Sequence, residues 1–175
     1  FNPDKFLWVN FQYLKTRPLA QLADEIVPYI EAKGYRVPSD KQWLEKMLAT
    51  LRERAKTLTE LVDAAHYYLS DEIVLDPKAA EKFLTKDAVA PIQTLLEKLA
   101  ALSDFSESAI EKAFSATLSE HQLPMGKLAQ PVRVALTGGT VSPGIHDVIA
   151  VLGKERTIRR LQKTLEFIRQ LDSTR

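Results

Sequence analysis

"PSDKQWLEKMLATLRER", residues 38–54, is the part of the sequence that most clearly predicts a helix. Ser39 or Asp40 can begin it, because a short polar side chain accepts a hydrogen bond from a free amide of the first helical turn. Apolar residues then recur at intervals of three and four, which places them on one face of a helix, turned toward a core. These residues are Trp43, Met47, Leu48 and Leu51.

The same helical period continues on both sides of this stretch, and no segment with the alternating pattern of a strand competes with it. Gly34 is a natural end for the helix before residue 38, and Pro28 within that helix predicts a kink or a break. Thr57 and Glu60 form a capping box for the helix that follows. The fold class predicted is therefore all-α. Helices are expected at residues 3–15, 17–34, 39–54, 57–69, from 76, and at 87–102, 106–121, 127–136, 142–152 and 154–171.

Composition excludes several classes of protein. The 175 residues are 45% hydrophobic and 27% charged, and no apolar run approaches the roughly 20 residues that span a bilayer. There is no cysteine, which fits a cytoplasmic protein, and the three histidines are scattered. No grouping of nucleophile and base is apparent. We expect no catalytic residues, no metal site and no membrane contact.

Domain organisation and charge both change along the chain. A short extended piece near residues 72–75 suggests a boundary, with one subdomain at 1–75 and a second at 76–175. Residues 127–175 carry nine Lys and Arg against four Asp and Glu. Such an excess is typical of a solvated helix face, although an anion-binding surface has the same composition.

The stretch KLAQPVRVALTGGTVSPG, residues 127–144, combines unusual features. Pro131 removes a backbone donor, so it either starts or bends the helix that carries Arg133. Two glycines then allow a sharp turn, and Ser142 with Pro143 predicts the start of another helix. A guanidinium beside free amides makes a donor-rich corner suited to a base edge, a phosphate or a carboxylate. An equally open structural alternative is that Arg133 binds C-terminal carbonyls of a neighbouring helix.

Aromatic residues gather in FLWVNFQY, residues 6–13, and in HYY, residues 66–68. Aromatic rings can stack on nucleic-acid bases. Their helical spacing predicts instead that both groups belong to the core.

The segment from 126 to 165, GKLAQPVRVALTGGTVSPGIHDVIAVLGKERTIRRLQKTL, resembles the C-terminal anticodon-binding region of bacterial glutamyl-tRNA synthetases. That family carries K-x-x-QP-x-R-x-ALTG, then SPG or TPG, then LGKER. FNPDKFLWVNFQYL, residues 1–14, is similar to the family's helix after the catalytic domain, and LRERAKTLTELVDAAHYY, residues 51–68, is similar to its R-x-x-TL-x-E helix. The resemblance thus spans the whole chain.

The resemblance implies two helical-bundle subdomains that form a cage around the anticodon loop of glutamate tRNA. By this resemblance Arg133 reads the first anticodon base and Arg54 the third, with Arg52 as a competitor for the third-base role. The pocket for the middle base is lined by Ser142, Pro143 and Ile145.

The resemblance also bears on cofactors and partners. ATP and Mg²⁺ belong to the full-length enzyme, whose nucleotide-binding signatures do not occur in this sequence, so this chain alone is expected to be non-catalytic. It is also expected to be a monomer. Its partners would be tRNA and the catalytic domain of the same polypeptide. Two alternatives stay open: a helical protein–protein scaffold, and the related cage of a class I lysyl-tRNA synthetase. Acceptance of glutamine tRNA is also open.

Overall fold

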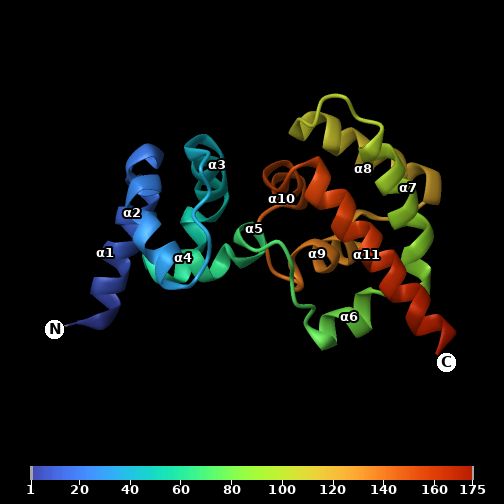
Figure 1. Ribbon diagram of the computed structural model, residues 1–175, viewed down its shortest axis with the longest axis horizontal. Coiled ribbons are helices and arrows are strands. Elements are labelled where there is room, and N and C mark those ends of the chain that lie inside the picture. The colour runs from blue at the N-terminus through green and yellow to red at the C-terminus, as the bar shows by residue number, and fades with distance from the viewer. Residues whose placement is uncertain (1, 175) are drawn as a thin grey trace. The chain divides into compact units, whose positions relative to one another are not determined.

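The computed structural model describes residues 2–174, and all regular secondary structure in that range is helical (Figure 1). The all-α prediction is confirmed. The pattern of internal contacts divides the chain into two compact units, Phe1–Asp71 and Glu72–Arg175. Each unit has its own buried side chains.

The first unit is built around the helix predicted from residues 38–54. Asp40 is its cap, since the Asp40 carboxylate accepts a hydrogen bond of 3.2 Å from the backbone N–H of Trp43. Leu44, Met47 and Leu48 are buried. The helices of the unit are α1 (Pro3–Thr16), α2 (Leu19–Ala32), α3 (Lys41–Leu51), the 3₁₀ turn η1 (Arg52–Arg54), α4 (Leu58–Ala64) and α5 (His66–Leu69).

Two local expectations for this unit differ from the structure. α2 is continuous through Pro28, so the chain does not break there. The helix expected at 57–69 is divided at Ala65 into α4 and α5. Its start is as predicted, because the Thr57 hydroxyl accepts a hydrogen bond of 3.0 Å from the backbone N–H of Glu60.

The two aromatic groups have opposite environments. Tyr67 and Tyr68 are buried, and the Tyr68 ring meets Trp43 edge-on at 6.4 Å, which confirms the core prediction for these two residues. His66, the third member of the group, is exposed. The prediction is wrong for residues 6–13, because Phe6 is 55% and Trp8 62% exposed. The physical reason is that the consecutive apolar residues 6–9 of α1 point to different sides of the helix, whereas only one stripe of a helix can pack against its own unit.

The second unit places its longest helix, α11, against α7, α9 and α10 (Figure 1). Its N-terminal segment, residues 72–76, is extended and leads into α6. The helices are α6 (Pro77–Phe83), the 3₁₀ turn η2 (Lys86–Ala88), α7 (Val89–Ala100), α8 (Glu107–His121), α9 (Met125–Thr137), α10 (Ile145–Leu152) and α11 (Lys154–Ser173).

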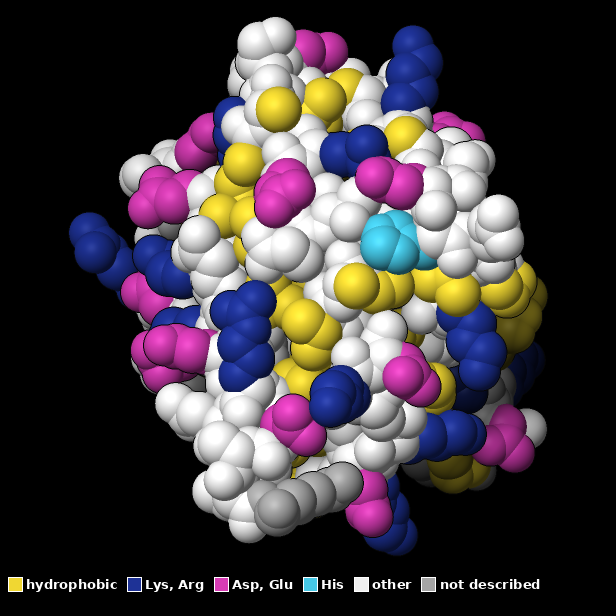
Figure 2. Space-filling model, turned by 90° about the vertical axis from the view of Figure 1, so that its right-hand side faces the viewer, with side chains coloured by type: hydrophobic (Ala, Val, Ile, Leu, Met, Phe, Trp, Pro, Cys, Tyr) yellow, Lys and Arg dark blue, Asp and Glu magenta, His cyan; other side chains and the backbone are white. Residues whose placement is uncertain are grey.

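Charges of both signs are interspersed on the face shown in Figure 2, where Lys and Arg alternate with Asp and Glu. Many described cations are also paired, such as Lys163 with Glu72 at 2.9 Å and Lys86 with Asp172 at 3.6 Å. This mixture is typical of a solvated surface. On that face the Lys and Arg side chains do not form a single patch.

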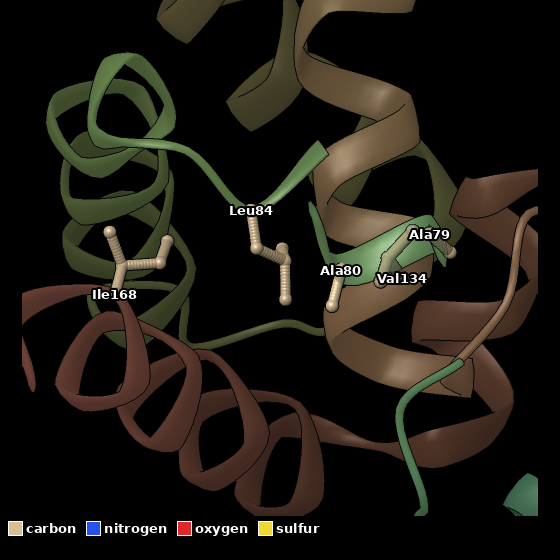
Figure 3. Close-up of a cluster of buried hydrophobic side chains, with 5 residues drawn as sticks. All are labelled: Ala79, Ala80, Leu84, Val134 and Ile168. Atoms are coloured by element: carbon tan, nitrogen blue, oxygen red, sulfur yellow. The ribbon is translucent and has the colours of Figure 1, made fainter. Parts of the chain in front are cut away.

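One buried cluster fixes α9 in the second unit (Figure 3). In this view Val134 of α9 lies beside Ala79 and Ala80 of α6, and Leu84 lies between Ala80 and Ile168 of α11. Leu75, at the end of the extended segment, packs against the same cluster. The helix that carries Arg133 is therefore held on both the α6 and the α11 side. The buried members of the cluster are Ala79, Ala80, Leu84, Val134 and Ile168.

Candidate nucleic-acid interface

α9 carries Arg133 in the middle of a buried helix. The helix begins at Met125 and runs through Pro131, so this proline does not start it. It ends at Gly138, whose φ of 87° is left-handed and whose N–H donates to the carbonyl of Val134 at 2.8 Å. Glycine adopts this conformation without the steric cost that a Cβ imposes.

Arg133 is half-buried and is anchored by the turn that follows its helix. Its Nε donates a hydrogen bond of 2.8 Å to Oγ of Ser142, and that hydroxyl donates in turn to the carbonyl of Pro143 at 2.7 Å. The structure thus brings together two of the residues singled out in the sequence, nine positions apart.

The predicted helix start at Ser142 is wrong. α10 begins at Ile145, with Gly144 as its cap residue and no capping side chain. The reason is that the Ser142 hydroxyl is occupied by Arg133 and by the carbonyl of Pro143. Pro143 and Ile145 are buried, whereas Ser142 keeps part of its surface.

The turn between α9 and α10 is fixed at its first residues. The Thr137 hydroxyl donates to the carbonyl of Arg133 at 2.7 Å and accepts from the N–H of Gly139 at 3.2 Å. The carbonyl of Gly138 accepts a bond of 2.8 Å from the N–H of Asp76. These bonds join the turn to the extended segment at residues 72–76.

A second arginine, Arg160, has the structural role that was considered for Arg133, which is to bind a C-terminal carbonyl of a neighbouring helix. Arg160 is 4% exposed, and its Nη1 donates a hydrogen bond of 2.8 Å to the carbonyl of Leu136, in the last turn of α9. The sequence contains the signal for this residue. Arg160 lies three and four positions from Thr157 and Thr164, both buried, and so shares the inward face of α11.

In the first unit, neighbouring arginines have different environments. Arg52 donates from Nε and Nη2 to the carbonyl of Leu14 at 2.9 and 2.8 Å, and it also bonds the carbonyl of Arg17. Its guanidinium therefore holds the end of α1. Arg54, at the end of η1, is exposed.

Two further polar groups lie at the start of α10. A hydrogen bond with Asp147 raises the pKa of Glu107, and the charge of Asp147 adds to this effect. The His146 ring meets Phe114 edge-on at 4.9 Å.

Within residues 2–174 there is no group of three or more potential metal-binding side chains. In the same range, no helix combines the length and the apolar character needed to cross a bilayer.

The chain is an all-α protein with an arginine anchored at a turn between two helices, and comparison with known proteins gives its family. Residues 21–165 match the family described as "Anticodon binding domain", so the chain belongs to that family. Its curated relatives are glutamate–tRNA ligases. That of Syntrophobacter fumaroxidans (strain DSM 10017 / MPOB) is 46% identical over 168 residues, which are 96% of this chain and 36% of the relative. That of Thermodesulfovibrio yellowstonii (strain ATCC 51303 / DSM 11347 / YP87) is 41% identical, over 95% of this chain and 36% of the relative.

Solved structures agree with this result. The crystal structure of a glutamate tRNA ligase from Elizabethkingia meningosepticum CCUG26117 is 25% identical with a TM-score of 0.88, over 96% of this chain and 33% of that chain. The glutamate-tRNA synthetase of Elizabethkingia anophelis gives a TM-score of 0.82 at 26% identity, over 95% and 32%. The chain therefore spans about a third of the length of the relatives it matches and corresponds to their anticodon-binding region. The resemblance found in the sequence is confirmed.

Proposed function

We propose that this chain recognises the anticodon loop of glutamate tRNA, and that Arg133 makes the principal base contact. The observation that carries the proposal is the 2.8 Å bond between Arg133 Nε and Ser142 Oγ. It anchors a guanidinium at a turn whose backbone is itself fixed. An anchored donor loses little conformational freedom when a ligand binds, so more of its interaction energy is available for discrimination.

The chemistry suits an unstacked base. A guanidinium presents a planar fork of N–H donors, and cytosine offers O2 and N3 as neighbouring acceptors on its pairing edge. A base without these acceptors leaves the donors poorly matched. By analogy with base-edge contacts in duplex DNA, such a contact is worth about 1–3 kcal/mol of discrimination.

The other anticodon positions would be read elsewhere. Arg54 is exposed, whereas Arg52 is bound to backbone carbonyls, and this contrast supports Arg54 as the reader of the third base. Ser142, with Pro143 and Ile145 behind it, would contact the middle base. The partial exposure of Ser142 and the burial of the other two support a role in which the serine touches the base and its neighbours set the shape.

The chain would act as part of a longer, cytoplasmic glutamate–tRNA ligase that uses ATP and Mg²⁺ and works as a monomer. Its catalytic domain would contact this chain directly. The exposed apolar side chains of α1 support that contact, because Trp8 is 62% and Val9 50% exposed.

The test is binding of the chain to glutamate tRNA transcripts with each anticodon base replaced in turn. Arg133→Ala is expected to weaken binding of the wild-type transcript by roughly 10- to 100-fold and to remove the preference for the first base. The matched control is Arg159→Ala, since Arg159 is an exposed arginine of the same unit, 3.9 Å from Glu155. Equal loss for every first base in the Arg133 variant would contradict direct reading.

A further inference from the structure

The two most exposed large apolar side chains among residues 2–174 belong to segments that touch each other. Val74 is 89% exposed and Val141 is 81% exposed. Val74 lies in the extended segment whose backbone contacts Gly138, at the start of the turn between α9 and α10. Val141 lies near the end of that turn, directly before Ser142. Isolated exposed valines are ordinary, but two on adjoining segments, one of them directly before the serine that binds Arg133, require a separate account.

Each valine is displayed outward by a fixed backbone. In the extended segment, side chains alternate between faces, so Ile73 and Leu75 are half-buried while Val74 points away from the unit. Its ends are held by the bond of Glu72 to Lys163 at 2.9 Å and that of Asp76 to Gly138 at 2.8 Å. Folding of the unit gains almost nothing from the Val74 side chain.

Val141 is fixed by the residues that follow it. Ser142 is bonded to Arg133, and Pro143 is buried. A valine side chain has one torsion and few rotamers, so its ordering on contact costs little. Both valines therefore present methyl groups whose position is set before any ligand arrives.

We propose that Val74 and Val141 form an apolar ledge against which one unstacked base of the anticodon loop packs its face, while Arg133 binds the edge of a base beside it. This inference rests on the proposed function. A base face is apolar and its edge is polar, so methyl groups next to guanidinium donors match the two parts of one nucleotide or of two neighbours. The exposed valines thus contribute affinity through contact with the ring of a base. Any of the four bases can make this contact.

The ledge is tested with serine variants of the whole chain and a glutamate tRNA transcript. Val141→Ser and Val74→Ser should each weaken binding by roughly 3- to 10-fold, the loss expected when a contact that buries much of a valine side chain is removed. The slope of log Kd against log salt concentration should stay unchanged, since no phosphate contact is lost. The midpoint of thermal unfolding should also stay unchanged, because both side chains are exposed in the free chain.

The control is Met125→Ser, which removes another exposed apolar side chain of this unit, at the opposite end of α9 from the turn. Its binding should stay within twofold of wild type. If Val74→Ser and Val141→Ser also bind within twofold of wild type, the proposed ledge is wrong. Arg133→Ala, measured alongside, separates the two proposals: if that variant loses first-base preference while the valine variants are silent, only the ledge fails. If Arg133→Ala is silent as well, the proposed function fails too.

Discussion

Gly138 lies so close to the backbone carbonyl of Val74 that no side chain fits between them. A Cβ at this position would overlap the Val74 oxygen, and φ at Gly138 is 87°, a conformation that L-residues rarely adopt. Gly138→Ala therefore combines backbone strain with a clash against backbone atoms. We expect a loss of roughly 2–5 kcal/mol in the free energy of unfolding, measured by urea denaturation.

Gly139 provides the control for this substitution. A Cβ there meets no atom within 4 Å, and its φ is not in the left-handed region. Gly139→Ala should leave the unfolding free energy within about 0.5 kcal/mol of wild type. Similar losses in both variants would mean that the turn needs glycine for flexibility and not for the contact with Val74.

Arg160 should matter for stability far more than the arginine beside it. Its removal leaves the carbonyl of Leu136 without its 2.8 Å partner and opens a cavity at a site that is 4% exposed. Arg160→Ala is expected to lower the unfolding free energy by roughly 2–4 kcal/mol. Arg159→Ala, which loses only an exposed pair with Glu155, should change it by less than about 0.5 kcal/mol. A small effect at Arg160, in the same denaturation experiment, would show that water can replace the guanidinium.

Ser142 is expected to act partly through Arg133. Ser142→Ala removes the acceptor of the 2.8 Å bond, so the guanidinium is less well positioned. Affinity for glutamate tRNA should fall by roughly 3- to 10-fold, corresponding to about one hydrogen bond, and preference for the first anticodon base should weaken. Ser142→Thr keeps the hydroxyl and should bind nearly as wild type. If the loss disappears for transcripts altered at the middle base and the preference for the first base is unchanged, Ser142 acts on the middle base and does not position Arg133.

Helices in this chain were predictable because their signals are local. Asp40 and Thr57 cap helices as their side chains and spacing indicate, and the apolar stripe of α3 is buried. The donor-rich corner was also predictable in its components, since Arg133 and Ser142 stand on either side of a glycine turn. What joins them, a side-chain bond across nine positions, depends on how the turn folds.

The misses have a common cause, which is competition between partners that are remote in sequence. Ser142 is a good helix cap by type, but its hydroxyl is taken by Arg133, so α10 starts later. The aromatic residues near Trp8 have the spacing of a core helix, yet α1 has too few neighbours to cover all its faces. Arg160 is a charged residue, which is usually found at the surface. It is buried because its guanidinium donates a hydrogen bond to a carbonyl at the end of α9.

The pair Glu107 and Asp147 should make stability depend on pH. Their hydrogen bond raises the pKa of Glu107, so the folded chain holds this proton more tightly than the unfolded chain. The contribution of this pair to stability is fully present below the ordinary carboxyl pKa, about 4.3. It is lost as pH rises through the raised pKa of Glu107 in the folded chain, above which two like charges face each other.

Glu107→Gln keeps a donor for Asp147 without the charge. It should therefore stabilise the chain at about pH 7, by a few tenths of a kcal/mol at this exposed site, and not at about pH 4. Denaturation of wild type and variant at both pH values measures this, with Glu81→Gln on α6 as a control that removes an exposed carboxylate elsewhere. A gain of the same size at both pH values would show that Glu107 does not share a proton with Asp147.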